Sequence, residues 1–201
     1  MTMCRKPSKI VFIKLSANST DRWNRMRIFS ILCLFSLVLP MSISGGGSFV
    51  VKSDLFQELV SEIKRVDSGE LIQKATYGQK VVAAVIVAEA ANEGNGMVAV
   101  AEVIRTRADK DDRTPLGIVK RRHQFSCLNS TTPELLLRKM KRHPQFGLAL
   151  LISRVTYNEP HRLSGYSKGA NHYHATWIKK PFWAQGIEPV VTIGRHAFYR
   201  I

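Results

Sequence analysis

The chain has 201 residues, a formal net charge of +15 and a pI of about 10.1. This length suffices for one domain with a proper core and is too short for two large ones. The excess of lysine and arginine favours an anionic partner, which would be a nucleic acid, an anionic membrane or an anionic polymer. The sequence contains no Cys/His spacing of the zinc-finger kind.

The N-terminal segment has the features of a secretory signal peptide. An apolar run of twelve residues, 28–39, follows Arg25 and Arg27 and precedes small residues that end at Ser44. The run is short for a transmembrane helix, so we expect contact with a membrane only through an uncleaved leader. Met26 is an alternative start that would give a compact leader. The pattern predicts export to the periplasm, the cell wall or the medium.

Removal of the leader would leave a domain that is still basic. Seven basic residues and one acidic residue fall within 1–44, so the remaining 23 basic and 14 acidic residues give 45–201 a net charge of +9. Cys4 and Cys33 lie in the leader, and Cys127 would be the single cysteine of the domain. An internal disulfide is therefore not expected, and Cys127 is more simply a small, partly buried apolar residue than a nucleophile.

Helical patterns dominate after a flexible glycine joint at 45–47. We expect a first helix from Ser53, as its cap, to about Val66. A central helix at about 79–91 and a third at about 97–107 are both apolar, and the short glycine loop between them predicts an antiparallel pair. Further helices are predicted from Pro115, at about 135–141 and at about 146–156.

The pattern changes after residue 159 to short alternating runs broken by glycine and proline. Two of these runs, 172–175 and 190–193, predict strands. Helices that come first and a small sheet that comes last are typical of an α+β fold.

The central helix carries an acid at the end of an apolar face. Eight apolar residues, 81–88, lead to Glu89, and Glu93 is predicted one turn later on the same face. Burial of an unpaired carboxylate is costly. Apolar neighbours raise the pKa of a carboxylic acid, and a general acid that works near neutral pH needs such a raised pKa. The alternative is a glutamate that turns to solvent or pairs with a basic residue.

The C-terminal region gathers histidines and aromatic residues. His172 and His174, two apart on a strand, would point to one face, where they could be metal ligands, part of a binding wall or hydrogen-bonded structural residues. A zinc site would need a third ligand that the sequence does not single out, so we expect no metal and no other cofactor. Rings such as Trp183 suit a sugar and a core equally well.

Six segments, in this order, resemble the SleB/CwlJ-like cell wall hydrolase family. The resemblance covers roughly residues 80–200, and the segments read AEAANEG (88–94), GMVAVAEVIRTR (96–107), QFS (124–126), GANHYHA (169–175), PFWA (181–184) and IGRHAFYR (193–200). Members of this family cleave the glycan strands of peptidoglycan. Their fold is similar to that of lysozymes and lytic transglycosylases, with a helical lobe, a small β lobe and a cleft between them.

The resemblance implies a domain organisation and a partner. We expect a signal peptide at 1–44, a linker and N-terminal helix at 45–78 and the catalytic domain at 79–201. The implied partner is the peptidoglycan glycan strand, and we expect a monomer that binds no nucleic acid.

The resemblance also implies roles for individual residues. Glu89 matches the family's essential glutamate, and Glu93 matches the second glutamate of the same segment. The residues that match the substrate-binding positions are Gln124, Phe125, Ser126, His172, Tyr173, His174 and Trp183. The chain departs from the family pattern at Ala91 and Asn92, where Arg-Gly is usual, and this departure leaves the substrate detail open.

The chemistry implied by the resemblance is that of a lytic transglycosylase. Glu89 would protonate the oxygen of the MurNAc–GlcNAc bond and then take the proton of the muramoyl C6 hydroxyl, which attacks C1 and leaves a 1,6-anhydro end. A rival mechanism uses Glu89 and Glu93 as a two-carboxylate glycosidase, but two side chains on one helix, with Cβ atoms about 5–6 Å apart, would approach the sugar from one side. We therefore favour Glu89 alone, with Glu93 in support.

The alternative to an enzyme is a basic, non-catalytic binding module. Such a module would bind the cell wall or nucleic acid through clusters such as 120–122 and 138–142, which are otherwise solvated helix faces. A binding module gives no reason for an acid at the end of a buried helix. The predicted export argues against nucleic acid as its partner.

Overall fold

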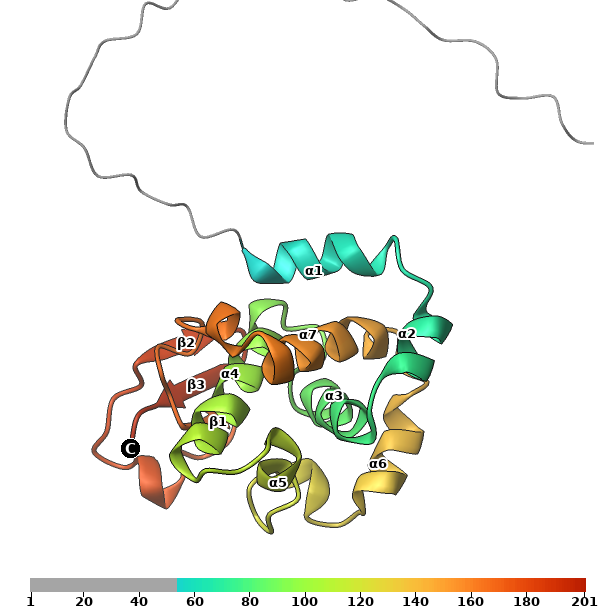
Figure 1. The fold of residues 1–201 in the computed structure, drawn as a ribbon. Coiled ribbons are helices and arrows are strands. Elements are labelled where there is room, and N and C mark those ends of the chain that lie inside the picture. The colour runs from blue at the N-terminus through green and yellow to red at the C-terminus, as the bar shows by residue number, and fades with distance from the viewer. Residues whose placement is uncertain (1–53) are drawn as a thin grey trace, which may run out of the picture. The chain divides into compact units, whose positions relative to one another are not determined.

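The computed structural model describes residues 54–201, so the predicted signal peptide lies outside the described part of the chain. This part forms seven α-helices followed by a small three-stranded antiparallel sheet (Figure 1). The α+β class predicted from the sequence is therefore confirmed. No helix within 54–201 is both long and apolar enough to span a bilayer.

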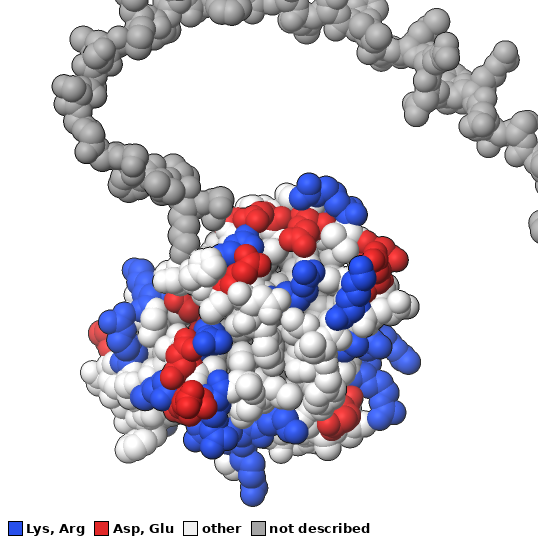
Figure 2. All heavy atoms as spheres, viewed as in Figure 1, with Lys and Arg blue, Asp and Glu red and all other residues white. Residues whose placement is uncertain are grey.

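The helices account for most of residues 54–158. They are α1 (Leu55–Ile63), α2 (Ser68–Lys74), α3 (Tyr77–Ala90), α4 (Asn95–Lys110), α5 (Pro115–Val119), α6 (Pro133–Met140) and α7 (Phe146–Asn158). Lysine and arginine side chains are spread over the face shown in Figure 2, with acidic side chains between them. The described part therefore presents its excess charge broadly on this face.

The start of the helical part differs from the prediction. The cap of α1 is Asp54, whose carboxylate accepts a hydrogen bond from the Phe56 N–H at 3.1 Å, and not Ser53. A second helix that the sequence did not predict begins directly after Asp67, whose side chain accepts from the Gly69 N–H at 2.9 Å. A short polar helix of this kind has little apolar periodicity to reveal it.

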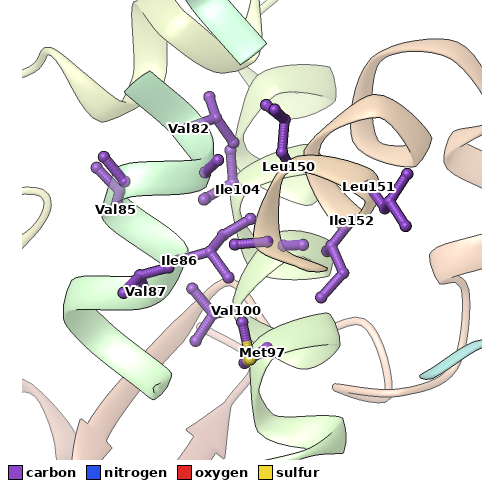
Figure 3. Close-up of a cluster of buried hydrophobic side chains, with 14 of the residues drawn as sticks. Val82, Val85, Ile86, Val87, Met97, Val100, Ile104, Leu150, Leu151 and Ile152 are labelled. Atoms are coloured by element: carbon purple, nitrogen blue, oxygen red, sulfur yellow. The ribbon is translucent and has the colours of Figure 1, made fainter. Parts of the chain in front are cut away.

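The central helix α3 forms the middle of the core. Its N-terminus is fixed by a capping box, in which Thr76 and Gln79 each accept a hydrogen bond from the other's backbone N–H. Side chains along 81–87 are at most 2% exposed, and each large one contributes about 1.5–3 kcal/mol by leaving water. Figure 3 shows Val82 and Ile86 turned toward side chains of α4 and α7, while Val85 points the other way. Helix α3 also packs against α5 and α6, so it is held on several sides.

The sheet has the strand order β1-β3-β2, with β1 at His172–Ala175, β2 at Val191–Ile193 and β3 at His196–Tyr199. The two predicted strands are present, but the central strand β3 was not predicted as a strand. All four residues of β3 are buried, and Phe198 packs with Ala99 and Val103 of α4. The sheet is thereby fixed to the helical part through α4.

Candidate active site

Glu89 lies in the last turn of α3, where the helix leaves the core. Its Oε1 accepts hydrogen bonds from the Ser126 hydroxyl at 3.3 Å and from the Cys127 backbone N–H at 3.2 Å. Its Oε2 accepts from the Tyr173 hydroxyl at 3.1 Å. Three neutral donors from distant segments thus surround this half-buried carboxylate, which neither turns freely to solvent nor relies on a salt bridge.

A cleft of about 480 Å³ opens beside Glu89. One wall comes from the segment 124–126, and the other comes from β1 and the loop that follows it. The predicted residues that line the cleft are Glu89, Gln124, Phe125, Ser126, Tyr173, His174 and Trp183. The chain therefore brings together residues that are far apart in the sequence, while His172 lies outside this lining.

The two histidines of β1 share one face of the strand, as predicted. The rings of His172 and His174 both contact Trp183, with centroid distances of 5.2 and 5.9 Å. His174 Nδ1 lies 2.9 Å from the Ala175 carbonyl, and His174 Nε2 lies 3.0 Å from the Tyr199 hydroxyl. Both histidines thus take part in ring packing, and within residues 54–201 no three His, Cys, Asp or Glu side chains gather as a metal site would require.

Tyr173 points the other way from these histidines, toward α3. Burial raises the pKa of Tyr173 well above its ordinary value, and the negative charge of Glu89 acts in the same direction. Burial likewise raises the pKa of the Cys127 thiol. Tyr173 therefore remains a proton donor to Glu89 at neutral pH, and Cys127 remains a neutral thiol with little nucleophilic character.

Arg107 of α4 also lines the cleft, although its sequence context did not single it out. Its Nε donates to the Asn171 carbonyl at 2.6 Å, and its Nη1 lies 3.3 Å from both the backbone and the side-chain oxygen of Gln124. The guanidinium carbon lies 5.4 Å from the centre of the Phe125 ring. Burial lowers the pKa of Arg107, which nevertheless stays charged, and the side chain links the two walls of the cleft.

Glu93 is not on the helical face of Glu89, contrary to the prediction. Helix α3 ends at Ala90, and Asn92 has a φ of 66°, which turns the chain. The Glu93 side chain is 5% exposed, and its Oε2 lies 2.8 Å from His196 Nδ1 on β3. Glu93 therefore joins the α3–α4 turn to the sheet and does not line the cleft.

The loop after β1 adds exposed aromatic surface to the cleft. Trp177 lines the cleft and is 61% exposed, and Phe182 beside the lining residue Pro181 is 89% exposed. The guanidinium carbon of Arg195 lies 5.0 Å from the centre of the Trp177 ring. The only sequence signal for Trp177 was its place in a region rich in aromatic residues.

Comparison with known proteins identifies the family. A family model described as Cell Wall Hydrolase matches residues 91–199, more than half of the chain. The matched range includes Glu93 and every predicted substrate-binding residue, and Glu89 lies two residues before it. No curated protein and no solved structure matches the chain. The chain therefore belongs to the Cell Wall Hydrolase family, the SleB/CwlJ family that its motifs resemble.

Proposed function

We propose that this protein cleaves the β-1,4 bond between MurNAc and GlcNAc in peptidoglycan glycan strands, with Glu89 as both acid and base. One observation carries the proposal: Glu89 is the sole acidic residue among the described residues that line the cleft. Membership of a cell wall hydrolase family supports the polymer class and a location at the cell wall or outside the cell. We expect the protein to act as a monomer.

The proposed reaction is a transglycosylation that consumes no water. Protonated Glu89 gives its proton to the glycosidic oxygen as the bond from that oxygen to C1 of MurNAc breaks. The resulting carboxylate takes the proton of the muramoyl C6 hydroxyl as O6 forms a bond to C1. One carboxylate serves both steps because the substrate supplies the nucleophile.

The hydrogen bonds of Glu89 fit this cycle. The hydroxyls of Ser126 and Tyr173 and the Cys127 N–H stabilise the carboxylate that is left after the first proton transfer. The same three contacts hold the carboxylate in one orientation, which favours transfer to a fixed oxygen. A free carboxylate on a flexible side chain would lack this advantage.

The remaining lining residues suit an N-acetylated sugar polymer. Trp177 and Trp183 offer flat rings for sugar faces, and Gln124 and Arg107 offer donors to hydroxyl or carbonyl groups. This combination of rings and polar groups supports a glycan rather than an apolar ligand.

The test is mass spectrometry of the soluble muropeptides released from purified peptidoglycan. We expect 1,6-anhydro-muramoyl ends from the wild type and none from Glu89→Gln. The matched control is Glu70→Gln, which changes an exposed glutamate of α2 paired with Lys74 and should release the same products as the wild type.

Two other results would change the proposal. Reducing ends in place of anhydro ends would show that water is the nucleophile and that the enzyme is a hydrolase. Binding to both ordinary sacculi and spore cortex without any release would indicate a non-catalytic wall-binding protein.

A further inference from the structure

We propose that Glu93 and His196 are a positioning pair that sets Tyr173 against Glu89. This inference rests on the proposed function of Glu89. It gives Glu93 a task that is not catalytic in itself, and it assigns a role to His196, which neither the sequence motifs nor the family match had provided.

The pair is buried and well connected. Side chains of Glu93 and His196 are 5% and 4% exposed, and Glu93 Oε2 lies 2.8 Å from His196 Nδ1. The Arg195 backbone N–H donates to the same oxygen at 3.3 Å, and Arg195 Nε lies 3.6 Å from Oε1. A buried carboxylate is retained at such a position only when partners compensate for its lost hydration, as these do.

Two glycines make room for the Glu93 carboxylate. A Cβ atom at Gly96 would lie 2.8 Å from Glu93 Cβ, and a Cβ atom at Gly194 would lie 2.8 Å from Glu93 Oε2. Gly194 also has a φ of +56°, a conformation that side-chain-bearing residues rarely adopt. The backbone on both sides is therefore shaped around this side chain.

His196 connects Glu93 to the cleft through contacts of its ring. Its ring meets Tyr173 edge-on, with centroids 5.3 Å apart and an interplanar angle of 85°. It also contacts Trp177 at 5.8 Å. The hydrogen bond between Glu93 and His196 Nδ1 restricts rotation of the imidazole, so the imidazole keeps its contacts with the Tyr173 and Trp177 rings.

These contacts form a continuous path from the α3–α4 turn to the acid. Glu93 fixes His196, the ring of His196 packs on Tyr173, and the Tyr173 hydroxyl donates to Glu89 Oε2 at 3.1 Å. Loss of the Glu93 carboxylate would free the imidazole and, through it, the tyrosine. The chemical step should then slow even though Glu89 itself is untouched.

The test is a double-mutant cycle on the protein purified from the full-length chain, with kcat for muropeptide release as the readout. Glu93→Ala should lower kcat about 10- to 100-fold, and Glu93→Gln should keep it within about threefold because the amide oxygen still accepts from His196. In a Tyr173→Phe background, Glu93→Ala should lower kcat by less than about threefold more, since both changes act on one hydrogen bond.

His196→Asn provides a second route if Glu93→Ala does not fold. Its amide nitrogen can still donate to Glu93, but it has no ring to touch Tyr173. We expect a loss of kcat similar to that of Glu93→Ala, and again little further loss in the Tyr173→Phe background.

Glu102→Ala is the matched control for loss of a buried glutamate. Glu102 accepts the backbone N–H groups of Gly165 and Ser167 at 2.9 and 2.5 Å, and none of these three residues lines the cleft. This variant should lower Tm, leave kcat of the folded protein within about twofold and combine additively with Tyr173→Phe.

Failure of this inference and failure of the proposed function would give different results. Equal losses from Glu93→Ala in both backgrounds would reduce Glu93 to a structural residue and overturn the inference. A Glu93→Gln variant as inactive as Glu89→Gln would make Glu93 a second catalytic carboxylate and overturn it too. A wild-type protein that releases no fragments would overturn the proposed function, and the positioning pair with it.

Discussion

Tyr173 shows how one residue can belong to the core and to the site at once. Its ring packs on Phe198 and His196, and its hydroxyl contacts Glu89. Because the neighbouring residues of a strand point to opposite faces, His172 and His174 are turned to Trp183 instead. The strand thus separates a residue that touches the proposed acid from two residues that pack on Trp183.

His172 should make the protein sensitive to acid. Burial, together with the positive charges of Arg107 and Lys110, lowers the pKa of His172 from its ordinary value of 6.5. As the pH falls below 6.5, His172 takes up a proton more readily in the unfolded chain than in the folded chain. This difference lowers the free energy of unfolding below pH 6.5 and has no effect well above that pH. We expect Tm to fall as the pH drops below about 6.5, and to fall less in His172→Phe.

Thermal unfolding followed by circular dichroism across this range checks the prediction. His161→Phe is the control, since it also removes one histidine. An identical acid-side loss of Tm in the wild type and in His172→Phe would contradict the assignment to His172.

The sequence indicated most of the cleft residues but not how they are connected. Motifs were enough to select Glu89 and its predicted neighbours, because residue type and order carry that information. They misplaced Glu93, because the end of α3 depends on the positive φ of Asn92. They missed Arg107, whose role depends on three oxygens, two from Gln124 and one from Asn171, that only the folded chain brings near it.

At the scale of elements, long apolar helices were predictable and short or fully buried pieces were not. The helices α3 and α7 follow from their apolar runs and lie close to the predicted bounds. The strand β3 is buried at all four positions, so it lacks the alternation that reveals a strand. Its identity is fixed by its place between β1 and β2, which is tertiary information.

The capping box of α3 provides a test at this scale. Thr76→Ala removes the side-chain acceptor for the Gln79 N–H, and we expect it to lower the free energy of unfolding by about 1 kcal/mol. The specific activity of the folded protein should not change, because the cap lies at the other end of the helix from Glu89. Urea unfolding measures the difference.

The control for this test is Thr131→Ala, a threonine that precedes the α6 cap and caps no helix. A loss of stability equal in both variants would show that the effect does not come from the capping box.

At the scale of the whole molecule, positive charge lies close to the proposed site. Two of the exposed basic residues, Lys120 and Arg122, stand shortly before the cleft segment 124–126. Peptidoglycan stems and attached polymers carry negative charge, so long-range attraction should assist binding to the wall. Such attraction between exposed groups is screened by salt over about 10 Å at 0.1 M.

We therefore expect binding of Glu89→Gln to purified sacculi to weaken as sodium chloride rises from about 50 to 200 mM. Replacing Lys120 and Arg122 by glutamine should weaken binding at low salt and reduce its salt dependence. The matched pair Lys64→Gln and Arg65→Gln, exposed at the end of α1, should have a smaller effect. A co-sedimentation assay measures the binding of Glu89→Gln and of the two paired variants. Equal losses of binding in the two paired variants would assign the attraction to net charge alone.

The central place of β3 in the sheet has a consequence for the order in which the enzyme is made. Tyr173 follows Glu89 by 84 residues, and His196 follows Glu93 by 103. While the polypeptide is still being synthesised, the helix that bears Glu89 is complete long before the strand that holds the opposite wall. A nascent chain therefore contains Glu89 without its donor Tyr173, and the candidate site is complete only when β3 has emerged and inserted between its two neighbours.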